Sequence, residues 1–183
     1  TAAEHTYLLV KDSIERQLVS DVPLATFLSG GLDSSIISKI ASAKYKESGK
    51  TLDTYSVDYT DNDKYFKKSL FQPNKDSDYI DVISSYIGSN HHNIVLNNVD
   101  VANALKEAVI ERGVPGFVDI DSSLMLFCKE VKKDFTVCLS GECADEIFAG
   151  YPWYHKKEIL FENVFPWARN TNIRQRILKN GFL

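Results

Sequence analysis

The sequence predicts an α/β fold in which a parallel, twisted sheet carries helices on both faces. Two observations lead to this prediction. Short apolar runs alternate along the chain with longer segments whose apolar residues recur at helical spacing. Two of the apolar runs end in Ser-Gly, in LATFLSGG and in CLSG, and acidic residues follow both. Because parallel strands are joined by helical crossovers, the alternating order favours a parallel sheet.

The first half of the chain alternates regularly. We expect a helix over 4–19, a strand over 24–28, a helix from the glycines to about Tyr45, a strand over 51–59, a helix over 76–88 and a strand over 91–97. LATFL is apolar throughout, which is typical of a strand buried on both faces. Gly88 ends its helix, as glycine commonly does.

The second half continues the pattern. Asp100 is expected to cap a helix. The apolar face of that helix carries Val101, Ala104, Leu105, Ala108 and Val109. Asp121 or Ser122 opens the next helix, FTVCLSG (135–141) forms a strand, and ECADEIFAGY is helical. Residues 60–76 are polar and long for a strand-to-helix connection, so we expect a flap or a mobile insertion.

Composition excludes several classes of protein. The 183 residues are enough for one domain, and 44% hydrophobic with 25% charged residues is ordinary for a globular protein. A net charge of −4 offers no reason to bind nucleic acid. No apolar stretch reaches the roughly 20 residues that span a bilayer, and the N-terminus does not resemble a signal peptide. The sparse cysteines, Cys128, Cys138 and Cys143, indicate reduced thiols in the cytoplasm and have no zinc-site spacing.

The stretch SGGLDSS, residues 29–35, lies where a parallel sheet binds ligands, at the carboxyl end of a strand. Gly30 and Gly31 carry no Cβ, so backbone N–H groups can approach a ligand closely. The following helix directs its free N–H groups to the same place. Three serine hydroxyls add donors, those of Ser29, Ser34 and Ser35. This arrangement predicts a cradle for phosphate or pyrophosphate.

Asp33 distinguishes this loop from a Walker A motif, which ends in Gly-Lys-Ser/Thr. A carboxylate inside an anion cradle is explained if Mg²⁺ accompanies the phosphates, since Mg²⁺ uses one or two carboxylates together with phosphate oxygens. The alternative is a Gly-Gly turn in which Asp33 merely caps a helix.

A second Ser-Gly bend followed by acidic residues occurs in CLSGECADEIFAGY. Ser140-Gly141 follows an apolar strand, and the acids Glu142, Asp145 and Glu146 come next. On a helix Glu142 and Asp145 would share a face. Three neighbouring acids at a strand's carboxyl end favour a bound cation, whereas a solvated acidic helix start is the alternative.

At these two stretches the chain resembles the synthetase domain of the asparagine synthetase family. SGGLDSS matches that family's pyrophosphate loop, and LSGECADEIFAGY matches its second signature. The resemblance extends over residues 5 to 157. The first motif alone would fit the wider group of ATP pyrophosphatases. The resemblance implies an adenine nucleotide alpha hydrolase-like fold, with residues 1–183 forming one ATP pyrophosphatase domain of a longer protein, truncated at both ends.

The resemblance also implies a reaction. The aspartate side-chain carboxylate attacks the α-phosphorus of Mg-ATP, giving β-aspartyl-AMP and pyrophosphate, and ammonia then displaces AMP to give asparagine. Pyrophosphate and metal would bind at Ser29, Gly30, Gly31, Asp33, Ser34 and Ser35. The positions around the adenosine would be Phe27, Val57, Ser140 and Gly141. Asp145 would be a second metal-linked acid, and Glu142 would orient the incoming amine.

Some features depart from the family pattern. Relatives carry a glutaminase domain that releases ammonia from glutamine, and here no cysteine precedes Cys128. RGVPGFVDI, residues 112–120, differs from the acid-rich version of relatives, which leaves the acceptor amino acid open. Two alternatives therefore stay open: another adenylating enzyme of the β-lactam synthetase type, and a nucleotide-binding fragment without turnover. A homodimer is a further open possibility.

Other suggestive residues receive simpler interpretations. His91 and His92 begin a strand without a third ligand, so we interpret them as surface or edge residues. Four aromatic residues are interpreted as core or interface packing, namely Tyr151, Trp153, Tyr154 and Trp167. Tyr151 also follows the second signature, together with His155 and Lys156. The basic tail Arg169–Lys179 is interpreted as a solvated helix face.

Overall fold

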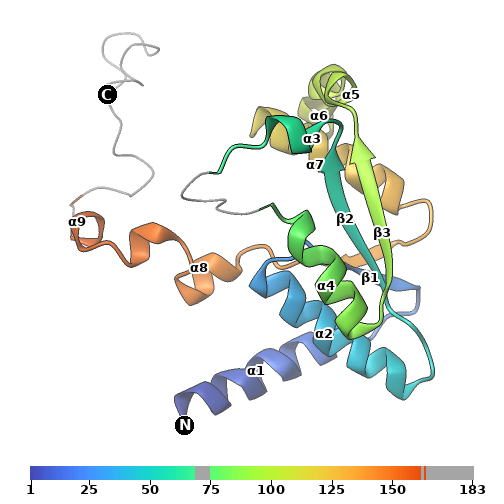
Figure 1. Ribbon diagram of the computed structural model, residues 1–183, viewed down its shortest axis with the longest axis vertical. Helices are drawn as coiled ribbons and strands as arrows, with labels where there is room; N and C mark the ends of the chain where they lie inside the picture. The colour runs from blue at the N-terminus through green and yellow to red at the C-terminus, as the bar shows by residue number, and fades with distance from the viewer. Residues whose placement is uncertain (69–74, 162, 164–183) are drawn as a thin grey trace. The chain divides into compact units, whose positions relative to one another are not determined.

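A computed structural model describes residues 1–68, 75–161 and 163 of the chain. These residues fall into two compact units, Thr1–Gly141 and Glu142–Leu183, each of which is described by itself. The first unit holds a sheet with helices on both faces, drawn from blue through green and yellow to light orange in Figure 1.

The sheet of the first unit has four parallel strands in the order β3-β2-β1-β4. They are β1 (Leu24–Phe27), β2 (Asp53–Tyr59), β3 (Asn90–Leu96) and β4 (Val137–Leu139). The predicted α/β class is confirmed. Because β1 has a strand on each side and helices above and below, Leu24 to Thr26 are buried, as the apolar run predicted. After β1 the chain adds β2 and then β3 on one side of β1, and it later adds β4 on the other side of β1. The strand order therefore reverses at β1.

Helices cover both faces of this sheet (Figure 1). They are α1 (Ala2–Gln17), α2 (Leu32–Glu47), α3 (Asn62–Tyr65), α4 (Ser77–Ile87), α5 (Asn98–Asn103), α6 (Leu105–Arg112) and α7 (Val118–Val131). The helix α2 packs on β1, α4 packs on β2, and α1 lies against α2. On the other face α7 packs on the sheet, and α5 and α6 pack on α7.

The two faces of the sheet differ in chemistry. The face toward α7 is apolar. Its buried cluster consists of Ala25, Tyr55, Phe127 and Val131, and is flanked by Phe27, Ile94, Phe135 and Cys138. Because side chains alternate along a strand, the neighbours of these apolar residues point to the opposite face, toward α2. On β1 this neighbour is Thr26, which carries a hydroxyl group. Thr26 and Ser38, both fully buried, share a hydrogen bond of 2.7 Å between β1 and α2.

The predicted helix with its cap at Asp100 is wrong in two respects. Asn97 caps α5 instead, because its side chain accepts a hydrogen bond of 2.8 Å from the N–H of Val99. The segment also divides into two helices, since α5 ends at Asn103 and α6 begins at Leu105.

The start of α7 also differs from the prediction. The helix begins at Val118, one turn before Asp121. The Asp121 carboxylate accepts hydrogen bonds from the Phe117 N–H at 2.8 Å and from Arg112 Nη1 at 2.6 Å. Asp121 therefore holds the turn that precedes the helix instead of opening the helix itself.

The described part of the predicted flap, residues 60–68 and 75–76, contains the short helix α3. The Asp58 carboxylate at the end of β2 accepts hydrogen bonds from Tyr59 N–H at 2.8 Å and from Asn62 Nδ2 at 2.7 Å. These bonds fix the start of the connection. Residues 69–74 lie outside the described residues, so the expectation of a flap stays a prediction.

The second unit contains short elements. They are α8 (Ala144–Phe148), the 3-10 turn η1 (Pro152–Tyr154) and α9 (Lys157–Leu160). The rings of Tyr151 and Trp153 stack with centroids 4.3 Å apart, which agrees with the packing interpretation of these aromatics. Trp167 and the basic tail 169–179 lie outside the described residues. Among the described helices, none has the length and apolar character needed to cross a membrane.

Candidate functional site

The loop that joins β1 to α2 is held by its own hydroxyl groups. Ser34 is buried, and its Oγ lies 3.0 Å from Ser29 Oγ and accepts from the Ser29 N–H at 3.2 Å. Ser35 Oγ donates to the carbonyl of Gly31 at 2.6 Å. The three serines of the predicted cradle thus fix the loop in this structure. Their binding of phosphate stays a prediction.

The first turn of α2 faces the end of β1. Gly31 is the N-cap in an extended conformation and offers no side-chain cap. The N–H of Ser35 makes the first bond of the helix, to the Gly31 carbonyl at 3.1 Å. The N–H groups before Ser35 have no acceptor within the helix, as at any helix start. Together with the positive end of the helix dipole, they suit an anion.

Gly30 is required by both conformation and space. Its φ of +78° lies in the left-handed region. A Cβ there would lie 2.8 Å from the Asp76 carbonyl oxygen and 3.0 Å from Tyr79 Cβ, at the start of α4. No other residue type fits this position without moving α4.

Gly141, which follows β4, lies against the loop after β1. A Cβ on Gly141 would lie 3.2 Å from both Asp33 Cβ and the Ser34 nitrogen. The two Ser-Gly bends therefore meet at the carboxyl edge of the sheet, between β1 and β4. This is the point where the strand order reverses, the usual place for a ligand in an open parallel sheet.

The acids of the second signature belong to the second unit. Glu142 precedes α8, and Cys143 occupies the N-cap with a φ of +70°. The prediction that Glu142 and Asp145 share a helix face is therefore wrong, because the helix begins only at Ala144. Asp145 lies inside α8, half-buried, and its carbonyl accepts from the Gly150 N–H at 2.9 Å.

Glu146 pairs with an aromatic residue of the second unit. Tyr151 donates a hydrogen bond of 3.2 Å to the Glu146 carboxylate. Burial raises the pKa of the Tyr151 hydroxyl, and the Glu146 carboxylate adds to this effect. Tyr151 thus stays protonated and acts as a hydrogen-bond donor at neutral pH.

The predicted adenosine residues of the first unit lie in different surroundings. The Phe27 ring packs on Phe127 with centroids 4.8 Å apart, in the apolar cluster. Val57 is 37% exposed and lines a cavity of about 370 Å³ between β2, β3 and the first turns of α4. Ser140 is exposed at the end of β4.

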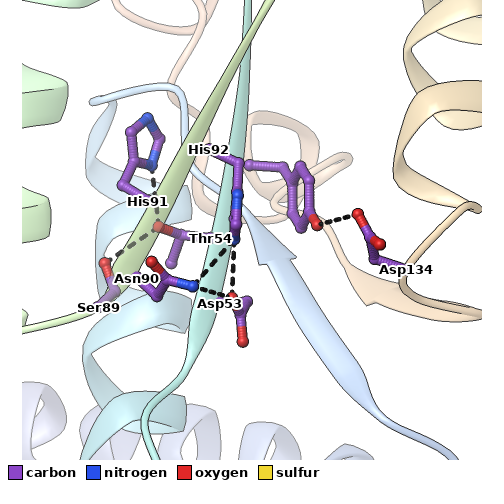
Figure 2. A network of polar contacts seen from close by, with 8 residues as sticks. Asp53, Thr54, Ser89, Asn90, His91, His92 and Asp134 are labelled. Carbon is purple, nitrogen blue, oxygen red and sulfur yellow. Dashed lines mark hydrogen bonds and ion pairs between the residues drawn. The ribbon is translucent and has the colours of Figure 1, made fainter.

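The wall of this cavity is polar. His91 Nε2 lies 3.0 Å from Ser56 Oγ, which donates to Asn93 Oδ1 at 3.0 Å, and these three side chains all line it. His91 Nδ1 bonds Thr54 Oγ1 at 2.9 Å, as Figure 2 shows. Burial lowers the pKa of His91, so its imidazole is neutral at pH 7.

The second histidine lies on the opposite face of the same strand. His92 Nε2 lies 2.8 Å from Asp53 Oδ1 (Figure 2). The His92 ring stacks on the Tyr55 ring with centroids 4.6 Å apart. The Tyr55 hydroxyl donates to Asp134, and burial raises the pKa of Tyr55 to about 12. Both histidines lie on the edge strand β3 in hydrogen-bonded networks, which agrees with their interpretation as edge residues.

Asp33 has the chemistry that a nucleotide-bound Mg²⁺ needs. It lies on the first turn of α2, beside Gly141. Among the described residues, no group of three His, Cys, Asp or Glu side chains converges into a metal site. Mg²⁺ usually takes only one or two carboxylates and completes its shell with phosphate and water oxygens. The residues present therefore fit an ion that is bound jointly with phosphates.

The sequence did not reveal the first turn of α4 as part of this region. Asp76, Tyr79 and Ile80 contact Gly30 although they lie about 50 residues away along the chain. Small residues in the sequence do indicate that these two helices pack closely. Both helices bury small residues, Ala41 and Ser42 on α2 and Ser84 on α4, and Ser42 bonds the Ile87 carbonyl of α4; small residues let helices approach closely.

Comparison with known proteins agrees with the two signatures. Residues 5–183 match the asparagine synthase family. The chain is 51% identical over 175 residues to Asparagine synthetase [glutamine-hydrolyzing] 3 of Bacillus subtilis, covering 95% of this chain and 28% of that protein. It is 33% identical over 147 residues to Asparagine synthetase [glutamine-hydrolyzing] 1 of Bacillus subtilis, covering 80% and 21%.

A more distant relative comes from Homo sapiens. Its asparagine synthetase [glutamine-hydrolyzing] is 26% identical over 162 residues, which cover 85% of this chain and 27% of the human protein. The chain thus spans less than a third of the length of these relatives. The match to the family extends from residue 5 to the last residue and includes both signatures and the loop at the strand-order reversal. The chain belongs to the asparagine synthase family.

Proposed function

We propose that this chain is the nucleotide-binding part of an ATP-dependent, amide-forming synthetase that converts aspartate to asparagine. The observation that carries the proposal is the contact between the two Ser-Gly bends, where Gly141 lies against Asp33 and Ser34 at the strand-order reversal. Membership of the asparagine synthase family, and the names of the relatives, indicate the reaction.

In the first half-reaction, a side-chain carboxylate oxygen of aspartate forms a bond to the α-phosphorus of ATP. The α–β phosphoanhydride bond breaks, and pyrophosphate leaves with the electron pair. Attack by one anion on another requires positive potential at the phosphates and in-line positioning. The first turn of α2 supplies that potential, and Asp33 would hold the Mg²⁺. When bound, Mg²⁺ neutralises negative charge on the phosphates.

Each predicted residue has a role in this scheme. The pyrophosphate would lie in the loop formed by Ser29, Gly30, Gly31, Asp33, Ser34 and Ser35. The adenosine would lie against Phe27, Val57, Ser140 and Gly141. Gly141 suits this place because its lack of a Cβ lets β4 approach the loop.

In the second half-reaction, ammonia attacks the acyl carbon of β-aspartyl-AMP. The bond between that carbon and the phosphate oxygen breaks, AMP leaves, and the nitrogen loses a proton. Glu142 is our candidate to orient the amine and take up the proton. Asp145 is proposed as a second, metal-linked acid.

The relatives are named for glutamine hydrolysis. We propose that the ammonia of this protein also comes from glutamine, released by a glutaminase domain elsewhere in the full-length protein. We further propose that residues 1–183 are part of one ATP pyrophosphatase domain. The three cysteines are free thiols, which supports a cytoplasmic protein.

The proposal is tested by pyrophosphate release. We expect the full-length protein to release pyrophosphate from Mg-ATP only when L-aspartate is present, and to form AMP and asparagine when ammonia is added. We expect Asp33→Ala and Asp145→Ala to abolish Mg²⁺-dependent nucleotide affinity in calorimetric titrations. Asp12→Ala is the control, because Asp12 pairs with Arg16 on the exposed face of α1.

Three outcomes would contradict parts of the proposal. Pyrophosphate release that depends on another carboxylate substrate would indicate a different adenylating enzyme, such as one of the β-lactam synthetase type. Binding of Mg-ATP without any release would indicate a nucleotide-binding module. If both Asp33→Ala and Asp145→Ala bind Mg-ATP like the parent, the metal assignment is wrong.

A further inference from the structure

The helix α4 contributes no residue to either signature, yet its first turn touches the nucleotide loop. A Cβ on Gly30 would lie 2.8 Å from the Asp76 carbonyl oxygen, 3.0 Å from Tyr79 Cβ and 3.3 Å from the Ile80 nitrogen. Two of these three atoms belong to the backbone, which cannot rotate away as a side chain can. Gly30 therefore packs directly on the first turn of α4.

The position of α4 is fixed from its other end. The carbonyl of Ile87, the last residue of α4, accepts hydrogen bonds from Ser42 Oγ at 2.8 Å and from Lys46 Nζ at 2.7 Å. Both donors lie on α2, whose first turn begins at the loop. The two helices are thus joined at their C-terminal ends, and Gly30 lies near both of their N-terminal ends.

The interface between the two helices also sets their separation. Ser42 of α2, which donates to the Ile87 carbonyl, is 2% exposed, and Ser84 lies on the buried side of α4. Small side chains bring helix axes close together, and packed interiors resist displacement. The space left for the loop at the open end is therefore narrow, and only a residue without a Cβ fits there.

Gly30 needs such support because glycine is the most flexible residue. It adopts positive and negative φ about equally well, so an unsupported Gly30 would sample several loop conformations. The φ of Gly30 is +78° in this structure. Because the first turn of α4 packs against Gly30, it limits the other backbone conformations that the loop can adopt. Restricting a loop to its bound conformation raises affinity, because less conformational entropy is lost on binding.

We propose that the first turn of α4 is a positioning element for the nucleotide loop, with the Asp76 carbonyl and Tyr79 Cβ holding Gly30 in its left-handed conformation. The inference rests on the proposed function, since it concerns how the pyrophosphate loop is preorganised. In this proposal Tyr79 is a positioning residue that acts through Gly30.

The test compares two pairs of variants in the full-length protein. Tyr79→Ala keeps the Cβ at the contact, whereas Tyr79→Gly removes it. Val82→Ala and Val82→Gly make the matched change one turn later, at a side chain that is 63% exposed. Each pair carries the same change of helix propensity, so their difference isolates the contact with the loop.

The probe is inorganic pyrophosphate with Mg²⁺, titrated calorimetrically. We expect Tyr79→Gly to bind about fivefold more weakly than Tyr79→Ala, which corresponds to the entropy of one freed glycine. Val82→Gly and Val82→Ala should bind within about twofold of each other. Thermal denaturation identifies any variant that is not folded. Equal affinity ratios at positions 79 and 82 would overturn the inference.

A second measurement uses the unmodified protein and so does not depend on how the variants fold. Hydrogen exchange is followed with and without Mg-pyrophosphate. Binding should slow exchange in the first turn of α4 as well as in the first turn of α2, because coupling between two elements is reciprocal. The amides of α5, which packs on α6 and α7 on the other face of the sheet, serve as the control. Protection confined to α2 would contradict the inference.

The two measurements separate this inference from the proposed function. If the unmodified protein binds neither Mg-pyrophosphate nor Mg-ATP, both the function and the inference fail. If it binds them but α4 gains no protection and the affinity ratios at positions 79 and 82 agree, the function stands and only the positioning role of α4 is wrong.

Discussion

The buried hydrogen bond between Thr26 and Ser38 allows a quantitative prediction about how α2 is held on the sheet. The two hydroxyl oxygens lie 2.7 Å apart, an ideal length for an O–H···O bond, and both residues are 0% exposed. One of the two hydroxyl groups donates and the other accepts. Removal of either one leaves a buried hydroxyl group that cannot reach water.

The magnitude follows from this burial. Thr26→Val and Ser38→Ala each remove one partner, and each should lower the free energy of unfolding by about 1–3 kcal/mol. If the two effects were independent, the double variant would lose the sum, about 2–6 kcal/mol. We expect instead that the double variant is no less stable than the worse single variant. Replacing both partners by apolar groups leaves no unsatisfied hydroxyl.

The assay is equilibrium denaturation in urea, with the slope of the free energy against urea checked in each variant. Thr26→Val combined with Ser85→Ala serves as the control pair, because Ser85 is exposed on α4 and the two effects should add. Additive losses for Thr26→Val and Ser38→Ala would refute the reasoning. They would mean that the two hydroxyl groups have other partners when separated.

Three further predictions concern stability. Burial lowers the pKa of His91 below 6.5, although the Asp81 carboxylate acts in the opposite direction. The imidazole of His91 therefore binds a proton more tightly in the unfolded chain than in the folded one. The melting temperature should therefore fall as the pH drops below about 6.5, and it should fall less steeply in His91→Asn. Equal slopes of melting temperature against pH in the parent and the variant would contradict this. Phe127→Ala should cost about 3–5 kcal/mol in urea denaturation, whereas Leu124→Ala, half-exposed on the same helix, should cost under about 1 kcal/mol. Asp121→Ala removes the acceptor for the exposed Phe117 N–H and should cost about 0.5–1.5 kcal/mol, while Arg112→Ala, 52% exposed, should cost less. Equal losses for the last two variants would show that the ion pair dominates.

The strands and long helices could be predicted because their signals are local. LATFL is apolar throughout since β1 is buried on both faces, and Gly88 ends α4 with a φ of +63°. The predicted helix start was wrong where two nearby residues both suit the N-cap position. Asn97 and Asp100 both suit an N-cap, and the choice depends on which turn buries Val101 and Ala104 against the fold.

The candidate site was predictable to a similar degree. The loop 29–35 could be identified because all its groups are consecutive in the sequence. The contact between Gly30 and Tyr79 could not, because it depends on how closely two helices pack. The start of α8 could not be predicted either. Cys143 adopts a φ of +70°, a conformation unusual for a residue with a side chain, and it removes Glu142 from the helix.

The contrast between the two sides of the sheet has a consequence for how this protein can change its sequence. An apolar core accepts exchanges of similar volume with small losses, so the side packed by Phe127 and Val131 has many solutions. A hydroxyl pair such as Thr26 and Ser38 has a fixed length and direction, and few substitutes preserve it. Random mutagenesis with selection for folded protein should therefore recover a varied set of residues beneath α7 and a narrow one beneath α2.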